Sequence, residues 1–222
     1  MKKIRLITAS FGNDKKELTV RSPIMHDDYI IDQIYYNNTN TKSRVNSLHP
    51  RTKGKIPKMM EWYEHPGYDY YIWVDSKFTL LDGFIDHMLE YAGDESADIC
   101  FFRHPERSSS KEEMDFMSDK MRVGDTYLLS RYEGEIMEEQ LNKYLADPSF
   151  IDDKLFYCGL FMYSKRLVEN RESNLMTDWF LHCILYHTQD QLWFPYLLHK
   201  HKVNYKVYTP HMLHNNFMLY NV

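Results

Sequence analysis

The chain of 222 residues carries 27 lysines and arginines against 32 aspartates and glutamates, and 43% of its residues are hydrophobic. This length and apolar content predict one folded domain over residues 1–222 and exclude a largely disordered chain. The formal net charge of -5 gives no overall positive field, so neither nucleic acid nor an anionic membrane surface is an expected partner.

Six short segments rich in β-branched or aromatic residues, each bounded by polar residues, are predicted to be strands. In chain order they cover 4–9, 29–36, 70–74, 99–102, 155–163 and 203–208. Apolar residues at three- and four-residue spacing predict helices between them, over 55–63, 81–92, 109–121, 133–144, 178–187 and 190–201. This alternation predicts an α/β fold, and no repeat or linker divides the chain.

Cysteine usage and hydropathy indicate the compartment. Cys100, Cys158 and Cys183 lie far apart and form no Cys-x-x-Cys pair, which leaves neither a disulfide framework nor a cysteine zinc site. The first apolar stretch ends at residues 13–16, too early for the core of a signal peptide, and no stretch reaches the ~20 apolar residues of a membrane span. We therefore expect buried thiols and a cytoplasmic protein.

Polar residues follow two of the predicted strands. The first strand is almost continuously apolar, as in a strand covered on both faces, and then reaches Ser10. Asp75 follows residues 70–74, and ligands of open α/β sheets gather at such carboxyl ends. A carboxylate beside a buried strand needs a partner against the cost of desolvation, so Asp75 is the first site candidate. The alternative for Asp75 is the cap of a helix over 79–89.

Residues 65–80, which read HPGYDYYIWVDSKFTL, resemble the glycosyltransferase-like family, formerly a domain of unknown function, of bacteria, plants and large DNA viruses. Further segments are similar to the motifs of this family, in the same order along the chain: 8–12, 58–62, 102–107 with 112–113, and 188–194. The resemblance implies a GT-A-like fold with a mostly parallel mixed sheet, flanking helices and a Rossmann-like nucleotide-binding half. It also implies a nucleotide-sugar donor.

The resemblance further implies that Asp75 stands where the GT-A fold has its Asp-x-Asp metal motif. Lys77 replaces the second carboxylate of that motif. A divalent cation is the expected cofactor, Mn²⁺ in preference to Mg²⁺, because GT-A-like enzymes often take a histidine ligand near the chain end, where His211 and His214 stand. Alternatively, Lys77 neutralises the diphosphate directly, since either cation stabilises the charge of the departing nucleoside diphosphate.

The expected donor site combines the end of the first strand, a basic stretch and the turn at Asp75. The basic stretch contains Arg44, Arg51, Lys53, Lys55 and Lys58 and suits a diphosphate, although a solvated basic face is the alternative. Phe11 is singled out as a stacking surface for the base of a UDP- or GDP-linked sugar. The donor set is Thr8, Ala9, Ser10, Phe11, Arg44, Lys58, Asp75, Ser76 and Lys77.

Asp190 lies between two glutamines and precedes an apolar, aromatic segment. It is either the cap of a helix or the general base that an inverting sugar transfer needs at the acceptor hydroxyl. Gln191 is expected to bind sugar hydroxyls. Arg103, His104 and Arg107 follow a predicted strand and are expected to hold phosphate or sugar oxygens, the alternative being a surface cluster paired with nearby acids.

These observations predict a glycosyltransferase that moves a hexosyl or deoxyhexosyl group from a nucleotide sugar to a carbohydrate or other hydroxyl acceptor by direct displacement. The first alternative is a sugar- or nucleotide-binding module of the same fold without turnover, because the second carboxylate is missing. A hydrolase is the second alternative, although the chain has no Gly-x-Ser-x-Gly elbow and no His-Glu-x-x-His pair.

Overall fold

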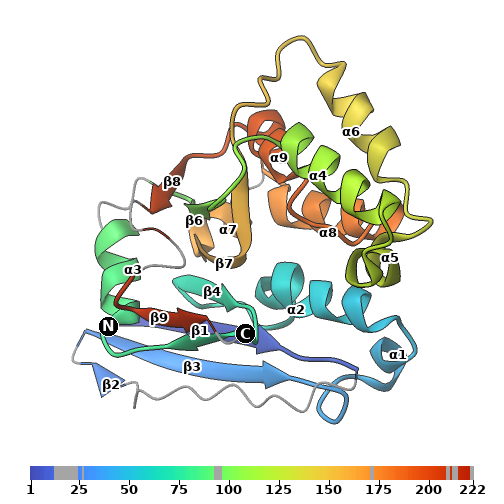
Figure 1. Ribbon diagram of the computed structural model, residues 1–222. Helices are drawn as coiled ribbons and strands as arrows, with labels where there is room; N and C mark the ends of the chain where they lie inside the picture. Colours follow the sequence, from blue (N-terminus) through green and yellow to red (C-terminus); the bar gives the residue numbers. More distant parts are fainter. Residues whose placement is uncertain are drawn as a thin grey trace.

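The computed structural model describes residues 1–12, 25–26, 28–92, 97–170, 173–208, 211 and 215–220. Figure 1 shows the strands extending upward from the lower edge of the view, with the helix over residues 84–92 at the left and most helices of the second half of the chain at the upper right. The elements are β1 (Lys2–Ala9), β2 (Met25–His26), β3 (Tyr29–Tyr36), α1 (Ser43–Asn46), α2 (Pro50–Glu64), β4 (Tyr70–Val74), β5 (Phe78–Leu80), α3 (Phe84–Ala92), β6 (Ile99–Arg103), α4 (Ser110–Arg122), α5 (Thr126–Tyr132), α6 (Met137–Leu145), β7 (Phe156–Ser164), α7 (Lys165–Glu169), α8 (Leu175–Leu185), α9 (Phe194–His201), β8 (Tyr205–Tyr208) and β9 (Met218–Tyr220).

Seven strands form one mixed sheet in the order β2-β3-β1-β4-β7-β6-β8, and β5 pairs with β9 in a second sheet. β1 is parallel to β3 and β4, and β6 is parallel to β8, whereas β7 runs antiparallel to both β4 and β6. Because β7 is antiparallel to both of its neighbours, β6 runs parallel to β4. The same direction is therefore shared by β3, β1, β4, β6 and β8. The predicted α/β class with a mostly parallel mixed sheet is confirmed, and the shared carboxyl edge is where ligands of such sheets bind.

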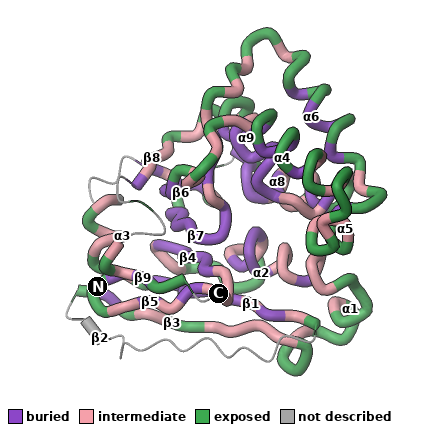
Figure 2. Tube along the Cα trace, viewed as in Figure 1, coloured by how far each residue is buried: buried purple, intermediate pink, exposed green. Residues whose placement is uncertain are grey.

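Alternating side chains divide the core into two layers. From β4, Tyr71 and Trp73 enter the layer with α2, α4, α6, α8 and α9, whereas Tyr70, Ile72 and Val74 enter the layer with α3 and the small sheet. Figure 2 shows the buried residues along β4 and β7 and the exposed ones along α1. All five residues of β4 are buried, which explains its continuous apolar pattern.

All six predicted strands are present, as β1, β3, β4, β6, β7 and β8. Among the helices, α2 begins earlier than expected, at Pro50, where proline suits the first helical position. α3 begins later than expected, at Phe84, because Gly83 before it has a φ of 78°, which a helix does not accommodate. α9 begins at Phe194 instead of residue 190 and has a proline in its first turn.

The remaining expectations about the fold concern thiols and membranes. Cys100, Cys158 and Cys183 are free and buried, as predicted. Within the ranges that the structure describes, no helix combines the length and apolar character that crossing a membrane requires. The assignment of the whole chain to one domain stays a prediction.

Candidate active site

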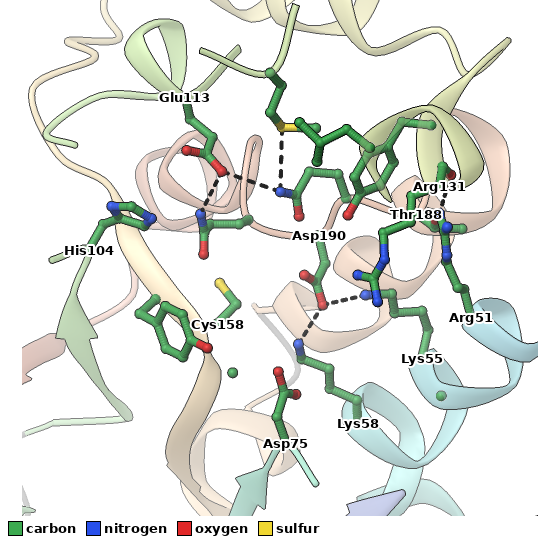
Figure 3. Close-up of a pocket in the computed structure, with 18 of the residues that line it drawn as sticks. Arg51, Lys55, Lys58, Asp75, His104, Glu113, Arg131, Cys158, Thr188 and Asp190 are labelled. Atoms are coloured by element: carbon green, nitrogen blue, oxygen red, sulfur yellow. Dashed lines mark hydrogen bonds and ion pairs between the residues drawn. The ribbon is translucent and has the colours of Figure 1, made fainter. Parts of the chain in front are cut away.

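A pocket of about 480 Å³ opens at the carboxyl ends of β1 and β4. Figure 3 shows its side chains converging from α2, from the strand ends and from the helices opposite them. Six cationic and three acidic side chains line it: Arg51, Lys55, Lys58, Lys77, Arg107 and Arg131, with Asp75, Glu113 and Asp190. Because the whole chain has a net charge of -5, this local excess of positive charge favours an anionic ligand in the pocket.

One face of α2 supplies three of these cations. Arg51, Lys55 and Lys58 follow the i, i+4, i+7 spacing that places side chains on the same side of a helix. With a rise of ~1.5 Å per residue they form a row about 10 Å long. Gly54 also lines the pocket, and nothing lies within 4 Å of the position that a Cβ would take there. A ligand therefore has room to approach the backbone of α2.

Asp75 directly follows β4 and is positioned by the neighbouring strand β7. Its backbone N–H donates to the carbonyl oxygen of Gly159 at 2.7 Å, and the indole N–H of Trp73 donates to its Oδ1 at 2.8 Å. Lys77 Nζ lies 3.7 Å from Oδ2. Strand β5 begins at Phe78, so the alternative of a helix cap at Asp75 is wrong.

Gly159→Ala is expected to lower the free energy of unfolding by roughly 1–3 kcal/mol, the usual cost of overpacking. A Cβ there would lie 2.8 Å from Asp75 Oδ2 and would overlap the ring of Tyr157, so a side chain must move. Urea unfolding measures the change. Gly54→Ala is the control, since its new Cβ meets no atom within 4 Å and alanine favours a helix. Equal stability of Gly159→Ala and wild type would contradict this packing.

Asp190 is buried between two lysines of α2. Its Oδ2 lies 2.7 Å from Lys55 Nζ and 2.5 Å from Lys58 Nζ, and its side chain is 8% exposed. Lys58 Nζ also lies 5.6 Å from the centre of the Trp73 ring and 5.9 Å from that of Trp179. Ion pairing and contact with aromatic faces together offset the cost of burying these charges.

The two ammonium groups determine the acidity of Asp190. Burial by itself raises the pKa of Asp190, but Lys55 and Lys58 outweigh burial and lower this pKa to about 2. In this arrangement the carboxylate is ionised at neutral pH and is a weak base. The residue before α9 is Trp193, and no side-chain bond caps that helix, so the alternative of Asp190 as its cap is wrong.

Glu113 of α4 contacts two of the expected substrate-binding residues. Gln191 Nε2 donates to Oε1 of Glu113 at 3.3 Å, and Arg107 Nε donates to Oε2. Arg107 also pairs with Glu106 at 2.9 Å, so the pairing with nearby acids that was expected as the alternative is present. Of this cluster, His104, Arg107 and Glu113 line the pocket. Burial and then Arg107 lower the pKa of His104 to about 4, which makes this pocket residue neutral at pH 7.

The end of β1 reaches the pocket through Ala9. The hydroxyl groups of Thr8 and Ser10 on either side are buried, and neither has a hydrogen-bond partner in the described part of the chain. Phe11 lines a separate cavity of about 330 Å³ on another face of α2, together with Tyr36. Of the expected donor residues of this strand and turn, Ala9 and Phe11 line different cavities, and Thr8 and Ser10 line neither of the two.

Several expected site residues do not line the pocket. Arg44 is exposed on α1, Arg103 is exposed at the end of β6, and His211 is exposed near the C-terminus. Ser76 is half-buried in the turn after β4. His214 lies outside the described residues, so its placement stays a prediction.

Among the described residues, the side chains do not form a complete cation site. Asp75 offers one carboxylate, which the Trp73 indole and the Lys77 ammonium already contact. No three His, Cys, Asp or Glu side chains in the described ranges are grouped to hold a metal ion. The expectation of Mn²⁺ stays a prediction.

Some pocket residues have little signal in the sequence. Tyr127, Arg131 and Tyr132 come from α5, whose seven residues are too few for a recognisable helical period. Lys55 belongs to the expected basic stretch but not to the expected donor set. Lys55 lies three residues before Lys58, and this spacing places both side chains on the same face of a helix. That spacing could have identified Lys55 from the sequence.

The sheet order, with the pocket at the carboxyl edge, defines a GT-A-like α/β fold. The crystal structure of mouse xyloside xylosyltransferase 1, apo form, is similar, with a TM-score of 0.50 and 10% identity over 93% of this chain and 85% of that chain. A197 from STIV has a TM-score of 0.42 and 11% identity over 100% of this chain and 95% of that chain. The TOD1/MUCI70 glycosyltransferase-like domain matches residues 43–218, so the chain belongs to this family.

Comparison with curated proteins gives no match. At 10% identity, the similarity to the xylosyltransferase shows the fold alone. The family match and the fold together confirm the resemblance inferred from the sequence, and they make this protein a glycosyltransferase-like protein.

Proposed function

We propose that this protein transfers a hexosyl or deoxyhexosyl group from a UDP- or GDP-linked donor to a hydroxyl of a carbohydrate acceptor, in the cytoplasm. The main observation behind the proposal is that Asp75, at the end of β4, lines the same pocket as Asp190 and six cationic side chains. A nucleotide sugar brings two phosphates to such a pocket, and the cations stabilise the charge that collects on the leaving nucleoside diphosphate. The family and the fold support glycosyl transfer in general.

In the proposed reaction, the acceptor oxygen attacks the anomeric carbon while the bond from that carbon to the diphosphate breaks. Asp190 takes the proton of the attacking hydroxyl, and the nucleoside diphosphate leaves with the bonding electrons. Asp75 accepts hydrogen bonds from donor hydroxyls, and Gln191 binds sugar hydroxyls beside Glu113. A single displacement of this kind inverts the configuration of the anomeric carbon.

The nucleotide is proposed to lie along the end of β1. Thr8 and Ser10 have buried hydroxyl groups without partners among the described residues, and buried polar groups in that state are rare unless a ligand or water completes them. Phe11 presents a half-buried ring in the neighbouring cavity and is the proposed stacking surface for the base.

The test of this function is a panel of nucleotide sugars and carbohydrate acceptors, assayed with Mn²⁺ and with EDTA. Released nucleoside diphosphate and the mass of the glycosylated acceptor are the two measurements. Asp190 held by two lysines favours a second candidate, a binding module without turnover. Thermal stabilisation by a nucleoside diphosphate, with no product from any donor, would establish that second candidate.

Asp75→Asn is expected to weaken donor binding about tenfold, because a charged hydrogen-bond acceptor at the end of β4 is lost. Calorimetry with UDP and GDP measures the effect, with and without Mn²⁺. Asp115→Asn is the matched control, since that carboxylate is 61% exposed on α4 and pairs with Lys111. Unchanged affinity in Asp75→Asn would exclude Asp75 from the donor site.

A further inference from the structure

In this structure Asp190 is ion-paired with two lysines, which makes it a poor base. Both of its ion pairs use Oδ2, at 2.7 Å from Lys55 Nζ and 2.5 Å from Lys58 Nζ. Figure 3 shows both ammonium groups reaching this carboxylate from α2. A carboxylate between two cations accepts a proton poorly, in agreement with the lowered pKa of Asp190. These ion pairs must weaken before Asp190 can take the proton of an acceptor.

The same two lysines are well placed to meet an anionic ligand. They line the pocket with Asp75 and Gly54, and Gly54 leaves open space next to α2. Their side chains are only 14% and 5% exposed, so each ammonium group needs a counter-charge. In this structure Asp190 supplies one counter-charge, which the two ammonium groups share. A diphosphate carries more negative charge than one carboxylate and offers several oxygens to the same donors.

Building on the proposed function, we propose that the diphosphate of the donor replaces Asp190 as the partner of Lys55 and Lys58. An ammonium group on a flexible four-carbon stem can turn from one acceptor to another, which suits lysine to this exchange. The exchange weakens both ion pairs of Asp190 while the carboxylate stays buried, and its proton affinity rises. Asp190 therefore becomes an effective base only when the donor is bound.

The exchange itself makes and breaks no covalent bond. Before the donor binds, the single Asp190 carboxylate faces both ammonium groups and balances only one of their two positive charges. Afterwards, phosphate oxygens face both. The only proton that moves is the one that the acceptor hydroxyl gives to Asp190 during transfer. Because the diphosphate must bind before the ion pairs of Asp190 weaken, Asp190 is a strong enough base only when a leaving group is present. The acceptor hydroxyl therefore loses its proton as the diphosphate departs.

The first test measures the affinity of UDP, GDP and inorganic pyrophosphate by calorimetry in EDTA. Asp190→Asn removes the competing carboxylate and is expected to tighten binding about tenfold. Lys55→Gln is expected to weaken binding about tenfold, because a charged donor to phosphate is lost. Lys111→Gln, on an exposed pair with Asp115 outside the pocket, is expected to change nothing and serves as control. Weaker binding by folded Asp190→Asn would show that Asp190 only positions the lysines and would overturn the proposal.

Asp190→Asn leaves two buried ammonium groups facing each other, so a crystal structure of wild-type protein with UDP or GDP is the second test. Lys55 Nζ and Lys58 Nζ are expected within about 3.2 Å of phosphate oxygens, with their contacts to Asp190 Oδ2 lost. Both ion pairs intact beside a bound diphosphate would overturn the exchange and leave the proposed function standing. Absence of binding by both nucleoside diphosphates and pyrophosphate would overturn both. Diphosphate binding with the exchange of partners, but without turnover from any sugar donor, would remove the proposed function and the role of Asp190 as a base, and would leave the exchange of partners standing.

Discussion

Asp190→Asn is expected to lower the turnover number of sugar transfer by about 10² or more, because an amide cannot take the proton of the acceptor hydroxyl. The side chain keeps its size, so the shape of the pocket changes little. From the sequence alone, unchanged donor affinity is expected for this variant. The structure changes that expectation to tighter binding, since Lys55 and Lys58 lose their carboxylate partner. The result is a low turnover number without a raised KM for the donor.

Steady-state kinetics with a donor identified from the panel measure both constants. Asp119→Asn is the control, because that carboxylate is 72% exposed and pairs with Arg122 on the surface of α4. A cooperative thermal transition must accompany the low activity of Asp190→Asn, to separate lost chemistry from lost folding. Wild-type turnover in a folded Asp190→Asn protein would remove Asp190 from the mechanism.

Arg5→Met is expected to lower the free energy of unfolding by about 3–5 kcal/mol, the usual cost of removing one partner of a buried ion pair. Arg5 lies on β1 with 7% of its side chain exposed, and its Nε donates to Glu61 Oε1 at 2.8 Å. A second donor nitrogen reaches Asp32 at 2.6 Å. Glu61 is 1% exposed and also accepts from the Tyr36 hydroxyl at 2.7 Å. Without Arg5, the carboxylate of Glu61 is buried with no guanidinium partner.

Urea unfolding of the single and double variants measures this effect. Arg5→Met combined with Glu61→Gln is expected to be more stable than Arg5→Met alone, because the second change removes a buried carboxylate that has lost its guanidinium partner and keeps only the Tyr36 hydroxyl and the half-exposed His65 imidazole. Arg122→Met is the comparison at the surface, since Arg122 is 78% exposed and its partner Asp119 is 72% exposed, and exposed pairs contribute about 0–1 kcal/mol. A loss below about 1 kcal/mol in Arg5→Met would contradict the assigned role of this pair.

Much of the fold is readable from local sequence pattern. β4 has five consecutive apolar residues buried on both faces, and such a run is distinctive without knowledge of its partners. β5 and β9, of three residues each, carry too short a pattern and exist because they pair with each other across the fold. α3 also begins later than its apolar periodicity predicts, because the positive φ of Gly83 prevents the helix from including that residue.

The candidate site divides in the same way. Asp75 stands out in the sequence because a carboxylate at the end of a buried strand is costly without a partner. Asp190 stands out less, because a helix cap explains an aspartate before an apolar segment equally well. The structure removes that alternative by pairing Asp190 with Lys55 and Lys58, and Lys55 lies 135 residues away in the chain. No local pattern encodes such a pairing.

Local sequence pattern was sufficient to predict the α/β class, the six main strands, the family resemblance and most of the side chains that can bind or react. It did so because strand and helix periodicities depend on neighbours within a few residues. The folded arrangement was needed to see that one face of α2 meets Asp190, that Phe11 lies in another cavity, and that Arg44 and Arg103 do not line the pocket. Those facts depend on how distant segments pack, because the partner of a buried charge is chosen by its surroundings in space and not along the chain.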